Sequence, residues 1–96
     1  MPIKKLLDES GLYVAEFGTL CGVSRQTVHN WMTGFEIAPL RKPKVDKLVA
    51  AIARAVEHGD LPAGELSSRK RTTKAVRAEL IKNIVIKHLR AIAAST

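Results

Sequence analysis

Side chains that form hydrogen bonds crowd the segment 24–33, SRQTVHNWMT. Arg25, Gln26 and Asn30 each end in a planar group with several polar atoms, so each can make paired hydrogen bonds to a flat partner. Hydroxyl and imidazole groups accompany them at Ser24, Thr27, His29 and Thr33. The chemistry that these groups offer is recognition by hydrogen bonding, although an ordinary solvated helix face has the same composition.

The sequence has no pattern that indicates catalysis or metal binding. His29, His58 and His88 are far apart in the chain and lack metal-ligand spacing with Cys21 or with a pair of carboxylates. It also lacks a glycine loop for phosphate and a recognisable nucleophile arrangement. We therefore expect no enzyme activity, no metal and no cofactor, and we expect Cys21 to be a core residue rather than a reactive thiol.

The positive charge of the chain is concentrated towards its end. The formal net charge is +7 over 96 residues. Residues 1–65 contain eight basic and eight acidic residues, whereas residues 66–96 contain eight basic residues and one acidic residue. This asymmetry indicates a polyanionic partner, and nucleic acid, an anionic membrane or an acidic protein would each satisfy it. A solubilising tail is the alternative.

Length and composition favour a single cytoplasmic domain. A chain of 96 residues is long enough for one domain and too short for two. The charged residues in its first 20 positions argue against a secretory signal peptide. No apolar run approaches the roughly 18 residues that span a bilayer, so we expect no membrane partner.

The spacing of apolar residues predicts an all-α fold. Apolar side chains recur at intervals of three and four residues, which is typical of helices with one buried face, and no strand pattern is convincing. The expected architecture is a compact helix-turn-helix bundle of four to five helices plus a C-terminal amphipathic helix. The predicted helices cover residues 2–10, 14–21, 25–33, 43–58 and 75–93.

Two glycines divide the segment 11–34 into a helix, a turn and a second helix. Gly18 is small enough for the second helix to approach the first, and Gly22 tolerates the positive φ of a tight turn. The Ser24 hydroxyl can cap the second helix. The apolar residues that would hold the two helices together are Phe17, Cys21, Val23, Val28 and Trp31.

This segment, GLYVAEFGTLCGVSRQTVHNWMTG, resembles the helix-turn-helix of the lambda-repressor-like family, the Cro and CI or XRE type. The likeness runs without a gap from Gly11 to Gly34, although Val14 stands where glutamine is usual. The resemblance implies that residues 1–60 form a DNA-binding domain. A basic linker over residues 61–74 and a C-terminal helix over residues 75–96 would follow it.

The resemblance also implies roles for individual side chains. In this family the N-terminal half of the second helix faces base edges in the major groove, which assigns base reading to Arg25, Gln26 and Asn30. Contacts with the DNA backbone are assigned to Ser24, Thr27, His29, Thr33, Arg41, Lys42 and Lys44. The charge pattern suggests a basic arm along phosphates, or a plain linker, that includes Arg69, Lys70, Arg71 and Lys74.

The apolar arc of the C-terminal helix is broader than one neighbouring helix needs. A second copy of the chain would cover the rest and give a symmetric dimer that reads a palindromic site. The alternative is that this helix completes the core of a single chain. The residues assigned to the dimer interface are Leu80, Ile81, Ile84, Val85, Leu89 and Ile92.

Together these features predict a small transcriptional regulator that binds double-stranded DNA. The leading hypothesis is a phage- or plasmid-type Cro-like repressor that acts as a homodimer on a palindromic operator. The main alternative is an antitoxin that binds a protein partner through its C-terminal helix and represses its own promoter. A phage component that recognises viral DNA is a third hypothesis.

Overall fold

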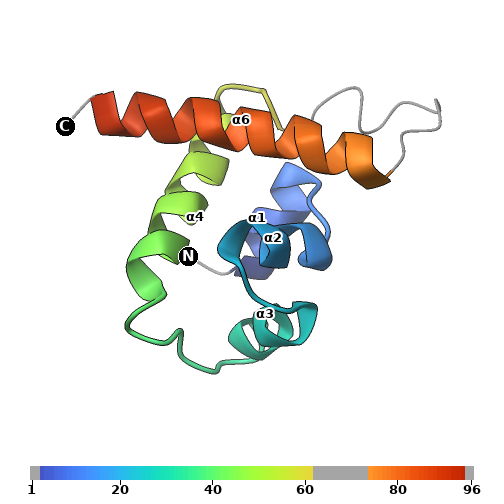
Figure 1. Cartoon of the computed structure of the whole chain (residues 1–96), viewed down its shortest axis with the longest axis vertical. Coiled ribbons are helices and arrows are strands. Elements are labelled where there is room, and N and C mark those ends of the chain that lie inside the picture. The colour runs from blue at the N-terminus through green and yellow to red at the C-terminus, as the bar shows by residue number, and fades with distance from the viewer. Residues whose placement is uncertain (1–2, 62–73, 95–96) are drawn as a thin grey trace.

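Helices make up most of the chain that the computed structural model describes, which is residues 3–61 and 74–94. This part of the chain contains five helices and no strand (Figure 1), which confirms the predicted all-α class. The helices are α1 (Ile3–Ser10), α2 (Val14–Cys21), α3 (Arg25–Met32), α4 (Lys42–Glu57) and α6 (Lys74–Ala94). Of the predicted basic arm, Arg69, Lys70 and Arg71 lie outside the described residues, and Lys74 is the first residue of α6.

α3 and α6 lie at opposite ends of the molecule. In Figure 1, α6 runs across one end, α3 lies at the other, and α1 and α2 lie between them. α4 leads from the end of the molecule near α3 up to α6 and packs against it. Because the buried sides of α3 and α6 both face the core between them, their exposed sides point away from each other.

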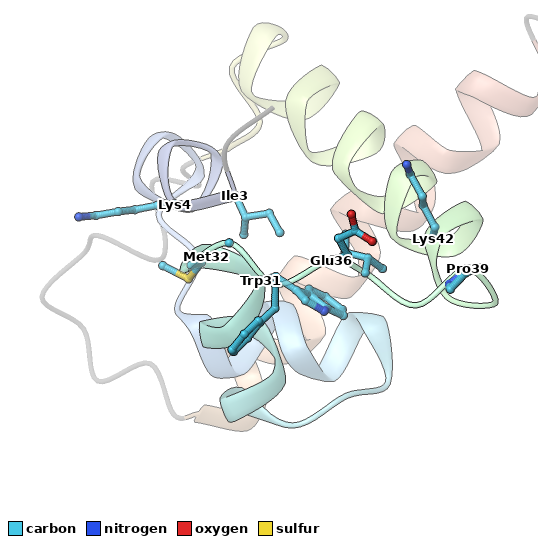
Figure 2. A pocket seen from close by; sticks show the side chains of 10 residues that line it. Ile3, Lys4, Trp31, Met32, Glu36, Pro39 and Lys42 are labelled. Carbon is cyan, nitrogen blue, oxygen red and sulfur yellow. The ribbon is translucent and has the colours of Figure 1, made fainter.

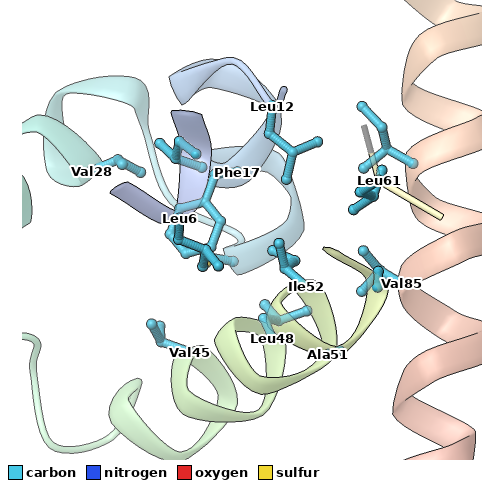
Figure 3. Packing of buried hydrophobic residues seen from close by; sticks show 14 residues of the cluster. Leu6, Leu12, Phe17, Val28, Val45, Leu48, Ala51, Ile52, Leu61 and Val85 are labelled. Carbon is cyan, nitrogen blue, oxygen red and sulfur yellow. The ribbon is translucent and has the colours of Figure 1, made fainter. Parts of the chain in front are cut away.

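One apolar core connects all five helices of the described chain. Figure 3 shows Phe17 of α2 and Val28 of α3 pointing into this core, together with Ile52 of α4 and Val85 of α6. Leu61, which follows α4, is buried beside α6. Burial of such side chains is the main source of free energy that holds helices together, so α6 is part of the folded unit rather than an appendage.

The structure corrects two residues of the predicted dimer interface. Ile81 and Val85 are each 1% exposed because they fill the core of their own chain, so neither side chain is open to a second copy. Ile84, Leu89 and Ile92 are partly buried and also pack against this core. Leu80 is partly buried outside the core cluster. Completion of the core therefore accounts for most of the apolar arc of α6.

Polar contacts anchor α6 at two well-separated positions. Near its start, Arg77 donates hydrogen bonds to both carboxylate oxygens of Glu16 on α2. Further along, the buried His88 ring lies 2.7 Å from Asp60, measured from Nε2 to Oδ2. This pairing with His88 lowers the pKa of the Asp60 carboxyl below its ordinary value of 3.8. These two contacts hold α6 in register on α2 and on the end of α4.

Candidate nucleic-acid interface

The turn between α2 and α3 is built from backbone hydrogen bonds around Gly22. Gly22 ends α2 with φ 74° and ψ 29°, in the left-handed region that glycine adopts at little cost. The Gly22 and Val23 amides donate back to the carbonyl groups of Thr19 and Gly18, at 3.2 and 2.9 Å. The chain therefore leaves α2 abruptly and starts α3 three residues later, as the two-glycine pattern predicts.

Replacing Gly22 by alanine should destabilise the protein by about 1–2 kcal/mol, because a Cβ disfavours the left-handed conformation. Space is not the cause, since the nearest atom to an added Cβ is Lys44 Nζ at 3.8 Å. Urea denaturation would measure the loss. Gly22→Asn is the matched control, because asparagine tolerates this conformation better and should lose less stability. An alanine variant as stable as the parent would contradict this account of the turn.

Gly18 permits the close approach of α2 to the start of α3. A Cβ placed on Gly18 would lie 3.0 Å from the Val23 carbonyl oxygen and 3.4 Å from Cγ2 of Val28. The first distance is tighter than most contacts of a Cβ atom, so alanine here would need the turn to move by a few tenths of an ångström, whereas the second is close to ordinary van der Waals contact. The sequence-based role of Gly18 as the small residue between the two helices agrees with this geometry.

Ser24 starts α3 as the predicted cap. Its side-chain oxygen accepts a hydrogen bond from the Thr27 amide at 3.2 Å, which satisfies one of the unpaired N–H groups of the first turn. The Ser24 and Thr27 hydroxyls also lie 3.0 Å apart and share a hydrogen bond. Both hydroxyls are therefore held in place beside the N-terminal end of α3.

The outer side of α3 carries the residues that were assigned to base reading. Val28 is fully buried and faces the core, and Gln26 and Asn30 lie on the opposite side of the helix. Gln26 Nε2 donates a hydrogen bond to Asn30 Oδ1 at 3.1 Å. Arg25 is exposed next to them. The three side chains thus form one polar surface, and two of them are linked to each other.

The remaining predicted backbone contacts differ in their surroundings. The Thr33 hydroxyl donates to the Asn30 carbonyl at 3.0 Å, so it serves to close the end of α3. Thr27 and His29 are partly buried. The exposed members of the set are Ser24, Thr33, Arg41, Lys42 and Lys44.

The structure separates the three cations that follow α3. Lys44 lies close to Gly22 at the turn. Arg41 lines a hollow of about 280 Å³ together with Thr27 and Asn30, where the carboxylate residue Glu36 also lies. Lys42 lines a different hollow and does not join this group. Arg41 and Lys44 therefore extend the polar surface of α3, and nothing in their sequence positions distinguished them from Lys42.

Cys21 lies under this surface as a buried thiol. Burial raises its pKa to about 11 from an ordinary value of 9.0, and the nearby cations Lys44 and Arg41 only partly offset that effect. The structure therefore supports the assignment of Cys21 to the core, where it is 2% exposed.

The Cys21 thiol should react very slowly with thiol reagents in the native protein. Well below pH 9.0 the pKa shift lowers the thiolate fraction by about 100-fold, and burial slows the reagent further. Labelling by an aromatic disulfide reagent would measure the rate, with the urea-unfolded chain as the reference. Equal rates in the native and unfolded chains would show that the thiol is open to solvent.

Comparison of this chain with protein-family models, with curated proteins and with solved structures finds no match. Every helix in the described residues is too short or too polar to span a bilayer. Nor do residues 3–61 and 74–94 contain a cluster of three or more His, Cys, Asp or Glu side chains that could hold a metal ion. The polar surface of α3 and the two cations beside it form the candidate site.

Proposed function

We propose that this chain is a sequence-specific regulator that binds double-stranded DNA by placing α3 in the major groove, in the manner of the lambda-repressor-like family. One observation carries the proposal: Gln26 and Asn30 lie on the side of a capped helix opposite the buried Val28, and Arg25 is exposed at the first residue of the same helix. A helix fits the major groove of B-DNA, where each base pair displays a distinct set of donors and acceptors.

The hydrogen bond between Gln26 and Asn30 favours adenine as one target. With Asn30 Oδ1 occupied by Gln26, the pair still offers the Asn30 amide as a donor and Gln26 Oε1 as an acceptor. Adenine presents the matching acceptor N7 and donor N6 in the major groove. Arg25 has the forked donors that suit O6 and N7 of guanine. We therefore expect a short site that contains both bases.

Groups beside α3 would position the helix on the phosphates. Ser24 and Thr27 present hydroxyls at its N-terminal end, and Lys44 and Arg41 add positive charge near the turn. Contacts of this kind fix the register of a protein on DNA without reading sequence. His29, partly buried on the same helix, stays a proposed backbone contact.

Gln26→Ala should lower affinity for the preferred site by about 1–3 kcal/mol and leave binding to random DNA nearly unchanged. Selection of bound duplexes from a random pool, at one stated salt concentration, would first define the preferred site. Fluorescence anisotropy would then compare the two kinds of duplex. Lys44→Ala is the matched control, because loss of a phosphate contact weakens both equally and lowers the salt dependence. Equal losses for Gln26→Ala on both duplexes would count against base reading, and failure to select any sequence would count against the function.

The regulatory role that we propose is repression by a phage- or plasmid-type protein. Two copies on a palindromic operator would present two α3 helices to successive major grooves, about 34 Å apart. Bound in this way, the dimer would block access of polymerase to the promoter.

The outer side of α6 supports a second candidate function. Val76 is 49% exposed there, and the partly buried Leu80 and Ile86 do not belong to the core cluster. Such apolar groups on a docked helix suit a protein partner, as an antitoxin requires. The two candidates differ in genetic context: a small toxin gene next to this one, whose product is inactive only when both are expressed, would favour the antitoxin.

A further inference from the structure

The loop between α3 and α4 exposes apolar side chains that the fold of one chain does not use. Leu40 is 97% exposed and Phe35 is 66% exposed, the two largest values among the exposed large apolar residues of the described chain. Both lie in the segment 33–41, a few residues after the end of α3. Apolar groups gathered on a surface commonly mark a contact with another molecule.

An apolar hollow lies next to these side chains. Its volume is about 580 Å³, and it is lined mainly by apolar groups from α1, from the end of α3 and from the loop. Figure 2 shows Ile3, Trp31 and Pro39 around it. Leu40 does not line the hollow, but it directly follows Pro39, which does, so the most exposed apolar residue of the loop is next in the chain to a residue that borders an apolar hollow.

Charges of both signs border the same hollow. Glu36 supplies a carboxylate and Lys42 an ammonium group, while the Lys4 side chain extends away from the other labelled side chains (Figure 2). None of the three is in an ion pair with another of them. The hollow and its surroundings form a patch, which we call the loop patch. It contains the exposed Leu40, the hollow beside Trp31, the carboxylate of Glu36 and the ammonium group of Lys42.

We propose that this patch binds the same patch on a second copy of the chain about a two-fold axis. In such an interface, residue i of the first chain contacts residue j of the second, and residue j of the first chain contacts residue i of the second. Each surface must therefore complement itself in shape and in charge. Leu40 of each chain would enter the hollow beside Trp31 of the other, and Glu36 of each chain would face Lys42 of the other.

The position of the patch also suits the proposed DNA binding, on which its functional meaning rests. The loop starts where α3 ends, so pairing through it keeps both α3 helices close to the two-fold axis and able to reach one duplex. Pairing through the outer side of α6 would instead hold the two α3 helices at opposite ends of the dimer (Figure 1). The dimer itself can be measured without DNA, which separates this proposal from the DNA-binding proposal.

Sedimentation equilibrium of the full chain, without DNA, tests the proposal from micromolar to near-millimolar concentrations. We expect the parent chain to dimerise and Leu40→Glu to weaken the dimer by at least about 100-fold, because each interface would bury two unpaired carboxylates. Leu40 is exposed, so circular dichroism should show an unchanged fold. Asn83→Glu, on the exposed side of α6, is the control and should leave the dimer intact. A monomeric parent, a dimeric Leu40→Glu variant or a dissociated Asn83→Glu variant would each overturn the proposal.

A mixing experiment tests whether the charges meet between chains. Glu36→Lys and Lys42→Glu should each dimerise poorly, since one variant has only cations and the other only carboxylates at these two positions. An equimolar mixture should recover the dimer, because every contact between unlike chains then joins opposite charges. Sedimentation of the mixture that shows no more dimer than either variant alone would overturn the pairing of Glu36 with Lys42.

Discussion

Arg77→Ala should lower the free energy of unfolding by about 3–5 kcal/mol, the range seen when one partner of a buried ion pair is removed. The Arg77 and Glu16 side chains are only 12% and 9% exposed. Arg77 Nε and Nη2 donate to the two Glu16 oxygens at 3.0 and 2.9 Å, and Nη2 also donates to the Gly11 carbonyl at 3.2 Å. The variant leaves a carboxylate away from water without its cation.

The same guanidinium makes contacts that the alanine variant also loses. It lies 4.3 Å from the centre of the Tyr13 ring, a favourable cation–π geometry. Its carboxylate partner, Glu16, accepts a further hydrogen bond from the Tyr13 amide at 2.8 Å and so caps the start of α2. Arg77 therefore connects α6 to the helix that supports α3, and its loss should also loosen the candidate DNA-binding surface.

Urea denaturation monitored by circular dichroism would measure the effect of Arg77→Ala. Lys5→Ala is the matched control, because Lys5 pairs with Glu9 at 3.9 Å on the exposed surface of α1. Exposed pairs of this kind contribute about 0.3–0.5 kcal/mol. Equal losses in the two variants would show that Arg77 and Glu16 are not a buried pair in solution.

Ile81→Ala should cost about 2–5 kcal/mol, because it removes buried methyl and methylene groups and leaves a cavity in the core. Ile81 is 1% exposed where α6 covers the rest of the core. If α6 were a separate appendage that did not pack on the rest of the chain, Ile81→Ala would lower the free energy of unfolding by less than this. A loss of the expected size would thus establish that residues 1–60 alone are not the complete folded unit.

Ile86→Ala provides the control for Ile81→Ala within the same helix. The two substitutions remove the same atoms and change helix propensity equally, but Ile86 is only partly buried and lies outside the core cluster. We expect a loss of about 1 kcal/mol or less for Ile86→Ala, in line with partial burial. Thermal or urea denaturation of both variants would measure the difference. Similar losses would contradict the docked position of α6.

The local elements were predictable because each depends on neighbouring residues. Glycine at position 22 indicated the left-handed turn, and Ser24 indicated the cap, before any tertiary contact was known. The spacing of apolar residues predicted four to five helices plus a C-terminal helix, and the described residues contain four helices plus the C-terminal one, over nearly the residues expected. The exposure of Gln26 followed from its position opposite the buried Val28, whereas Arg25 is exposed at the first residue of α3.

Other features depended on contacts between distant parts of the chain. Helical spacing showed that Ile81 and Val85 are apolar and aligned, but it could not say whether their neighbour was α4 or a second copy. Likewise, Lys42 and Lys44 are two residues apart and have the same charge, and only the fold places Lys44 near Gly22 and Lys42 at the hollow beside Trp31. No sequence pattern pairs Arg77 with Glu16, because 61 residues separate them.

The sequence by itself therefore determined the helical class, the turn at Gly22 and the polar side of α3, because backbone preference and apolar periodicity act within a few residues. Tertiary structure alone decided that α6 completes the core, that Arg77 neutralises Glu16 and that α6 lies opposite α3. The physical reason is that burial and ion pairing depend on which surfaces of the chain come into contact. The packing of the whole chain determines those contacts.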